Sequence, residues 1–100
     1  MKARNVFITG ASSGIGKATV YKFAEYGDNL ILCARRKENL NEIAQDIKNK
    51  WRSHVHIYEL DVTNYEDVSS VVKDLEDKDI KIDILVNNAG LASGLDKFQD

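Results

Sequence analysis

A glycine-rich segment near the N-terminus has the residue types and spacing of a phosphate-binding loop. Residues 9–16 read TGASSGIG and follow a short apolar run. Gly10 and Gly14 allow a sharp turn and a close approach to a ligand, and Gly16 allows the following helix to pack on the sheet. Backbone N–H groups at the helix start attract a pyrophosphate. We expect a side chain at Gly14 to block that approach. The alternative is a loop that only connects a strand to a helix.

Two arginines follow the next apolar run, about 20 residues beyond the glycines. At this place an NAD-selective site has an acidic residue that binds the ribose 2′-hydroxyl. This sequence instead has Ala34, followed by Arg35 and Arg36. Guanidinium groups suit a 2′-phosphate because they supply positive charge and fork-shaped donors. The pair therefore predicts NADP(H) as the cofactor. The alternative is that residues 35–37 simply begin a solvated helix.

Four short apolar runs alternate with three segments of helical periodicity. The runs are rich in Ile, Leu and Val, and they predict buried strands at residues 6–9, 30–34, 55–60 and 82–86. Between them, apolar residues recur on one helical face. These residues are Gly16, Val20, Phe23, Ala24 and Gly27; Leu40, Ile43, Ala44, Ile47 and Trp51; and Val68, Val71, Val72 and Leu75.

The alternation of strands and helices predicts an α/β fold with a Rossmann-type doubly wound parallel sheet. The seven elements, β-α-β-α-β-α-β, correspond to the first half of that fold, with strand order 3-2-1-4. Gly27 is expected to close the first helix, and Thr63 and Glu66 have the spacing of a capping box at the start of the third. A ligand should bind beyond the carboxyl ends of strands one and four.

Composition narrows the functional classes further. The 100 residues are 43% hydrophobic and 30% charged, which is typical of one globular domain. A net charge of −2 without a basic cluster argues against nucleic acid, and no apolar run is long enough to cross a membrane. The single cysteine, Cys33, is expected to be a buried small hydrophobe in a cytoplasmic protein. His54 and His56 lack further ligands nearby in sequence, so no metal site is predicted.

Three motifs together resemble the short-chain dehydrogenases/reductases. Residues 9–16 resemble the glycine-rich loop of that family, Asp61-Val62 its adenine-contacting pair, and residues 87–90 its N-N-A-G motif. The motifs occur in the family's order and spacing, and the resemblance covers nearly the whole chain. It implies a cofactor-binding set of Gly10, Ser12, Ser13, Gly14, Ile15, Gly16, Arg35, Arg36, Asp61, Val62, Asn88, Ala89 and Gly90.

The resemblance also implies a role for each part of this set. The glycine-rich loop would line the pyrophosphate and adjacent ribose, and Ser13 and Arg35 would meet the 2′-phosphate with help from Arg36. Asp61 would accept a hydrogen bond from the adenine amino group, and the Val62 backbone amide would meet the ring. Residues 88–90 would run past the ribose near the nicotinamide, whereas Asn87 would mainly tie the central strands together.

The family's catalytic residues do not occur in this sequence. The resemblance implies a Tyr that exchanges a proton with the substrate, a Lys four residues later, and an upstream Ser. The tyrosines at 21, 26, 58 and 65 are followed four residues later by Glu25, Leu30, Val62 and Ser69. No catalytic residue is therefore assigned. We expect residues 1–100 to be the N-terminal part of one NADP-binding domain, inactive by itself because these catalytic residues are missing. We also expect it to be only marginally folded, and the uncovered edge of its fourth strand to favour aggregation.

For the complete protein, the resemblance implies an oxidoreductase that transfers a hydride between NADP(H) and a small-molecule alcohol or carbonyl. Residues 91–94, LASG, with residues 34–36, are similar to the branch that oxidises 3-hydroxy acids and serine-like substrates. A 3-oxoacyl-thioester or general carbonyl reductase remains the alternative enzyme. A noncatalytic NADP(H)-binding module or redox sensor is the alternative from another class. The resemblance further implies a homo-oligomer.

Overall fold

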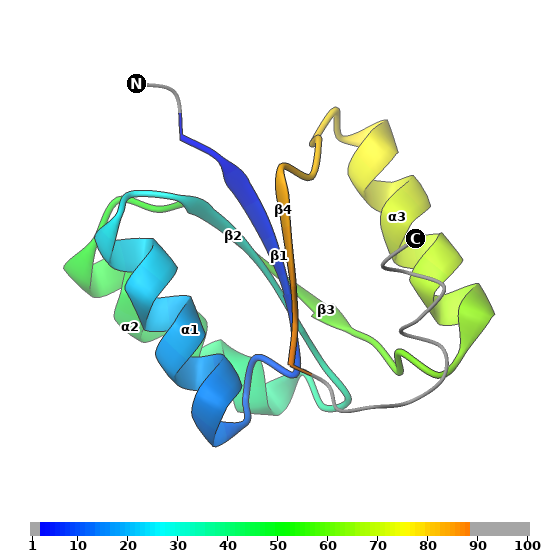
Figure 1. The fold of residues 1–100 in the computed structure, drawn as a ribbon, viewed down its shortest axis with the longest axis horizontal. Helices are drawn as coiled ribbons and strands as arrows, with labels where there is room; N and C mark the ends of the chain where they lie inside the picture. The colour runs from blue at the N-terminus through cyan, green and yellow to red at the C-terminus, as the bar shows by residue number, and fades with distance from the viewer. Residues whose placement is uncertain (1–2, 89–100) are drawn as a thin grey trace.

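A computed structural model describes residues 3–88, which form a four-stranded parallel sheet with helices on both faces (Figure 1). The elements are β1 (Asn5–Thr9), α1 (Gly14–Glu25), β2 (Asn29–Ala34), α2 (Glu38–Lys50), β3 (Val55–Glu59), α3 (Tyr65–Asp77) and β4 (Ile84–Asn87). The strand order is β3-β2-β1-β4, and all three strand pairs are parallel. The predicted Rossmann-type α/β fold and its strand order are confirmed for the N-terminal part that these elements form.

The alternation of side chains along the strands divides the core into two layers. Val6 and Ile8 of β1 pack in the cluster that includes buried residues of α1 and α2, whereas Phe7 packs in the cluster on the α3 side. All three side chains are completely buried. Burying an aliphatic or aromatic side chain of this size contributes about 1.5–3 kcal/mol. The apolar runs therefore fix β1 and β2 at the centre of the sheet, between the two helical layers (Figure 1).

The predicted helical faces agree with the structure, but one predicted cap is wrong. Gly27 closes α1 with a φ of +84°, as expected. The third helix is capped by Asn64, whose side chain accepts hydrogen bonds from the N–H groups of Glu66 and Asp67. Thr63 does not cap the helix because both its N–H and its hydroxyl donate to the Asp61 carboxylate, at 2.9 and 2.6 Å.

The predicted strand ends differ from the observed ones by one or two residues. The third strand ends at Glu59, although the Leu60 N–H still donates to the Ala34 carbonyl at 2.8 Å. The fourth strand begins at Ile84 and continues to Asn87. The Asp83 carboxylate accepts a hydrogen bond from the Asn5 N–H at 2.8 Å. This side-chain contact marks where the regular pairing of β1 with β4 begins, which apolar content alone does not reveal.

A hydrogen-bonded tyrosine joins the two helices on the first face of the sheet. The Tyr21 hydroxyl on α1 donates to Asp46 of α2 at 2.6 Å, and Lys50 forms an ion pair with the same carboxylate at 3.5 Å. The Tyr21 ring also meets the Trp51 ring edge to face, with centroids 6.0 Å apart. The bond to Asp46, with burial, raises the pKa of Tyr21 to about 12. The same hydrogen bond lowers the pKa of Asp46, although burial acts on that carboxyl in the opposite direction.

Replacing Tyr21 with phenylalanine is expected to lower the thermal midpoint of the protein by a few degrees at pH 7, because Asp46 loses the hydroxyl donor and keeps only Lys50 among the described residues. The folded state raises the pKa of Tyr21, so this contribution is complete below about pH 10. It is lost as the pH rises towards 12. Thermal unfolding followed by circular dichroism should show the difference narrowing above pH 10. Tyr26→Phe is the control, since that exposed ring contacts Lys22 through its face. Equal losses in both variants would contradict the assignment.

Candidate functional site

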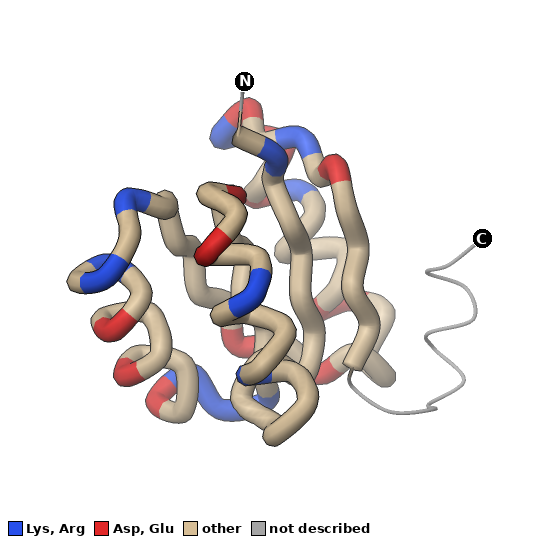
Figure 2. Tube along the Cα trace, turned by 60° about the vertical axis from the view of Figure 1, so that its left-hand side comes forward, with Lys and Arg blue, Asp and Glu red and all other residues tan. Residues whose placement is uncertain are grey.

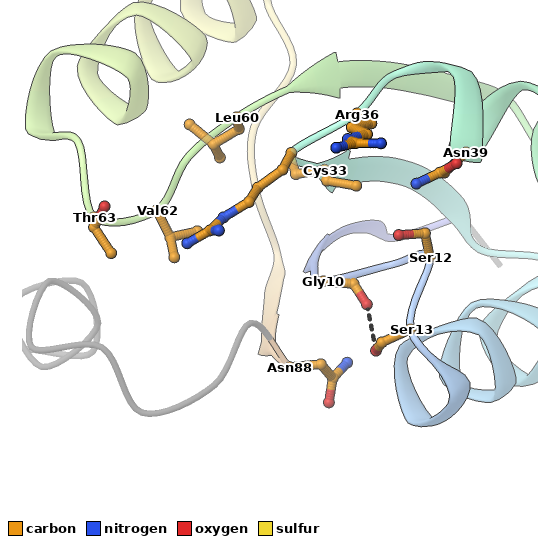
Figure 3. Close-up of a pocket in the computed structure, with 12 residues that line it drawn as sticks. Gly10, Ser12, Ser13, Cys33, Arg36, Asn39, Leu60, Val62, Thr63 and Asn88 are labelled. Carbon is orange, nitrogen blue, oxygen red and sulfur yellow. Dashed lines mark hydrogen bonds between the residues drawn. The ribbon is translucent and has the colours of Figure 1, made fainter.

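A cleft of about 380 Å³ opens at the carboxyl end of the sheet (Figure 3). The segments that follow β1, β2, β3 and β4 all contribute to it, and it lies where the sequence predicted a ligand site. We call it the main cleft. Its lining residues are Gly10, Ser12, Ser13, Cys33, Ala34, Arg35, Arg36, Asn39, Leu60, Val62, Thr63 and Asn88.

The glycine-rich loop forms a tight turn that lines one side of this cleft. Gly10 has a φ of +59°, and its carbonyl oxygen accepts hydrogen bonds from both the N–H and the hydroxyl of Ser13, at 3.2 and 2.8 Å (Figure 3). The Ser13 hydroxyl also accepts from the Gly16 N–H at 3.2 Å and caps α1. Ser13 therefore fixes the turn and the start of the helix at the same time.

The structure gives a reason for a glycine at position 16 that differs from helix packing on the sheet, the reason expected from the sequence. A Cβ at this position would overlap the carbonyl oxygen of Gly10, so the obstacle is the loop's own backbone and not the sheet. A Cβ at Gly14 would have no atom within 4 Å, which leaves room there for a ligand. Gly14, Ile15 and Gly16 form the first turn of α1 and do not line the main cleft. Ile15 is 77% exposed.

The two arginines lie at the rim of the main cleft with free side chains. Arg35 and Arg36 are exposed, and neither guanidinium forms an ion pair or hydrogen bond with any residue between 3 and 88. Figure 3 shows Arg36 on the same side of the cleft as Asn39 and Ser12, opposite Val62 and its neighbours. Two guanidinium groups that line the same cleft without hydrogen bonds to the described residues suit an anionic ligand group.

Asp61 is held next to the main cleft as an acceptor. Its carboxylate accepts from Thr63, and its own N–H donates to Asp67 at 3.4 Å. The hydrogen bonds from Thr63 lower the pKa of Asp61, and the nearby charge of Arg35 lowers it further. The ionised carboxylate can only accept hydrogen bonds, which suits an amino group of a ligand. Asp61 does not line the main cleft itself, whereas Val62 does.

Asn88 brings to the main cleft a buried donor that has no hydrogen-bond partner among the described residues. The Thr9 hydroxyl donates to Asn87 Oδ1 at 2.8 Å and accepts from the Asn88 N–H at 3.2 Å. Asn87 thus ties β4 to β1. The Asn88 side-chain Nδ2 is buried and has no hydrogen-bond partner among residues 3–88. Leaving such a donor unpaired costs about 1–3 kcal/mol, so a ligand oxygen at this point would be stabilising. Ala89 and Gly90 lie outside the described residues.

Several lining residues were missing from the predicted set. Cys33 is buried in the floor, and burial raises the pKa of its thiol to about 12, so it acts as a protonated hydrophobe, as expected. Asn39 lies in the first turn of α2, immediately before Leu40, the first buried residue of that helix. A polar residue at this place in the sequence could have indicated that its side chain lines the cleft. The sequence predicts Leu60 in a strand and Thr63 at a helix cap. Their places in the cleft follow from the turn after β3, which the apolar pattern does not report.

Three further features of the described residues bear on metal binding, nucleic-acid binding and membrane insertion. Residues 3–88 contain no group of three or more His, Cys, Asp or Glu that could hold a metal ion. Acidic and basic residues are interspersed along the helices and loops (Figure 2). Burial and Lys78 lower the pKa of His56, which lies on β3. None of the described helices is long and apolar enough to span a bilayer.

Comparison with known proteins agrees with this geometry. The chain is 41% identical over 101 residues to an NADP-dependent 3-hydroxy acid dehydrogenase of Schizosaccharomyces pombe, covering 100% of the chain and 39% of the relative. It is 42% identical over 95 residues to sulfoacetaldehyde reductase 2 of Chromohalobacter salexigens, covering 95% and 37%. The structure of L-sorbose reductase from Gluconobacter frateurii, complexed with NADPH and L-sorbose, superimposes with a TM-score of 0.83.

That solved structure is 39% identical and is matched over 90% of this chain and 34% of its own. The chain thus spans less than two fifths of the length of these relatives. A family model described as short chain dehydrogenase matches residues 4–100. Because this match extends over nearly the whole sequence and includes the strands and loops that form the main cleft, the chain belongs to the short-chain dehydrogenase family.

Proposed function

We propose that residues 1–100 are the N-terminal part of one NADP-binding domain in an oxidoreductase that interconverts an alcohol and a carbonyl. The observation that carries this proposal is the rim of the main cleft. There Ala34 replaces the acid of an NAD-selective site, and the guanidinium groups of Arg35 and Arg36 form no ion pair or hydrogen bond within residues 3–88. The NADP dependence named for the S. pombe relative and the NADPH in the L-sorbose reductase structure support this reading.

The residues of the main cleft would divide the cofactor among them. The glycine-rich loop would hold the pyrophosphate, Ser13 and the two arginines the 2′-phosphate, and Asp61 with Val62 the adenine. Asn88 would direct its unpaired Nδ2 to an oxygen of the ligand. Ala89 and Gly90 complete the proposed set by resemblance. The bound cofactor would supply the hydride, and the residues of this chain would bind and orient it.

For the substrate, we propose a chemical class and not a single compound. A 3-hydroxy acid is the first candidate, because the S. pombe relative is a 3-hydroxy acid dehydrogenase. A 3-oxoacyl-thioester or general carbonyl reductase is the alternative enzyme. A noncatalytic NADP(H)-binding module or redox sensor is the alternative from another functional class. For the complete protein we further propose a homo-oligomer in the cytoplasm.

The test is to isolate the protein that carries this chain, read its coding frame beyond Asp100, and titrate it with NADPH and NADH. We expect the frame to supply a Tyr-x-x-x-Lys preceded by a Ser, NADPH to bind at least tenfold more tightly, and NADPH to be oxidised with 3-oxo acids. Binding of NADPH without turnover of any carbonyl would favour the sensor. Failure to bind either cofactor would contradict the proposal.

A further inference from the structure

We infer that Glu59 is a positioning residue that sets the cofactor selectivity of this site. Its carboxylate holds the segment that carries Arg35 and Arg36, through a hydrogen bond from the Lys37 backbone N–H. The inference rests on the proposed function, because it concerns how the arginines are presented to a 2′-phosphate. The three motifs in the sequence do not include Glu59.

The segment with the two arginines is tied at both ends to the end of β3. Ala34 pairs with Glu59 in the β2–β3 register, and the Leu60 N–H donates to the Ala34 carbonyl at 2.8 Å. This bond fixes the chain immediately before Arg35. The Lys37 N–H donates to Glu59 Oε2 at 3.2 Å, which fixes the chain immediately after Arg36. Only the two arginines lie between these anchors.

The start of α2 explains why an anchor from another strand is needed. Lys37 is the N-cap of this helix and offers no side-chain acceptor to the first backbone amides. Helices usually obtain such an acceptor from Ser, Thr, Asp or Asn at the cap, and a negative charge there also complements the helix dipole. Glu59 supplies the negative charge from β3 and accepts a hydrogen bond from the N–H of Lys37 itself, whereas the N–H groups of Asn39 and Leu40 bond to the carbonyls of Arg36 and Lys37. The orientation of the arginine segment therefore depends on a residue 22 positions further along the chain.

The same carboxylate also has an opposing electrostatic effect. Glu59 lines a side hollow together with Arg35, Leu60, Asp61 and Asp67, next to the main cleft. A 2′-phosphate bound by the arginines would lie near this negative charge and be repelled by it. Glu59 thus favours NADPH by ordering the segment and disfavours it by charge. Two substitutions separate these contributions, since Glu59→Gln keeps the acceptor and removes the charge, while Glu59→Ala removes both.

The experiment measures dissociation constants of NADPH and NADH by cofactor fluorescence in the complete protein, for the wild type, Glu59→Gln and Glu59→Ala. We expect Glu59→Gln to bind NADPH as tightly as the wild type or a few fold more tightly. Glu59→Ala should bind NADPH about fivefold more weakly than Glu59→Gln, the effect of one hydrogen bond. The affinity for NADH should differ between the two variants by less than twofold. Glu76→Gln, an exposed acid on α3, is the control.

The outcomes separate the inference from the proposed function. Equal NADPH affinities in Glu59→Gln and Glu59→Ala would overturn the anchoring role. A parallel loss of NADPH and NADH in Glu59→Ala would show a general structural role and would overturn the effect on selectivity. A wild-type protein without preference for NADPH would overturn the proposed function, and this inference with it. Circular dichroism of each variant checks that the fold is retained.

Discussion

Replacing Gly16 with alanine is expected to weaken cofactor binding by about 100-fold, because the phosphate-binding loop would lose hydrogen bonds that contribute about 1 kcal/mol each. The new Cβ would overlap the Gly10 carbonyl oxygen and lie 2.9 Å from Ser13 Oγ. The turn would have to open, and Ser13 would lose the bonds by which it fixes the loop and caps α1. The dissociation constant for NADPH and the thermal midpoint should both change.

Gly14→Ala is the matched control for this prediction. A Cβ at Gly14 meets no atom within 4 Å, so this variant should fold at least as stably as the wild type, given the higher helix propensity of alanine. Any loss of affinity in Gly14→Ala would then report the approach of the ligand itself, which the sequence predicts. Wild-type affinity and stability in Gly16→Ala would show that the contact between Gly16 and Gly10 does not hold the loop.

The elements that could be predicted from sequence are those fixed by local patterns. The runs around Phe7 and Ile31 are apolar on consecutive positions because both faces of the central strands are buried. The alternation with helices then leaves one common topology, and the structure has it. The predicted cap of α3 was wrong because Thr63 and Asn64 are both good cap residues. Which of the two caps the helix depends on the Asp61 carboxylate, which binds the Thr63 hydroxyl.

The site could be predicted in part for the same reason. The glycine-rich loop and the arginine pair are each formed by consecutive residues, so the sequence pattern alone indicated a phosphate site. The structure places residues of both segments around one cleft. Asn39 and Glu59 act only through tertiary structure. Glu59 reaches Lys37 because β3 pairs with β2 in one particular register, and no local pattern encodes that contact.

The largest change in cofactor preference is expected from Ala34→Asp combined with Arg35→Ala. The aspartate would accept a hydrogen bond from a ribose 2′-hydroxyl and repel a 2′-phosphate, while the phosphate loses a charge-assisted donor. Hydrogen bonds to charged groups contribute about 1.5–3 kcal/mol, so the NADPH-to-NADH ratio of kcat/KM should fall by about 100-fold or more. Arg36→Ala alone is the comparison, since it removes one guanidinium without adding an acid.

The register of the sheet adds a condition to this double substitution. Position 34 pairs with Glu59, so the new aspartate would lie opposite an existing carboxylate, and like charges directly opposite one another are destabilising. The double variant should therefore be less stable than the wild type, and Glu59→Gln should restore stability while keeping the preference for NADH. Steady-state kinetics with both cofactors, together with thermal unfolding, measures the two effects separately. An unchanged ratio in the well-folded triple variant would show that Arg35 does not determine the choice of cofactor.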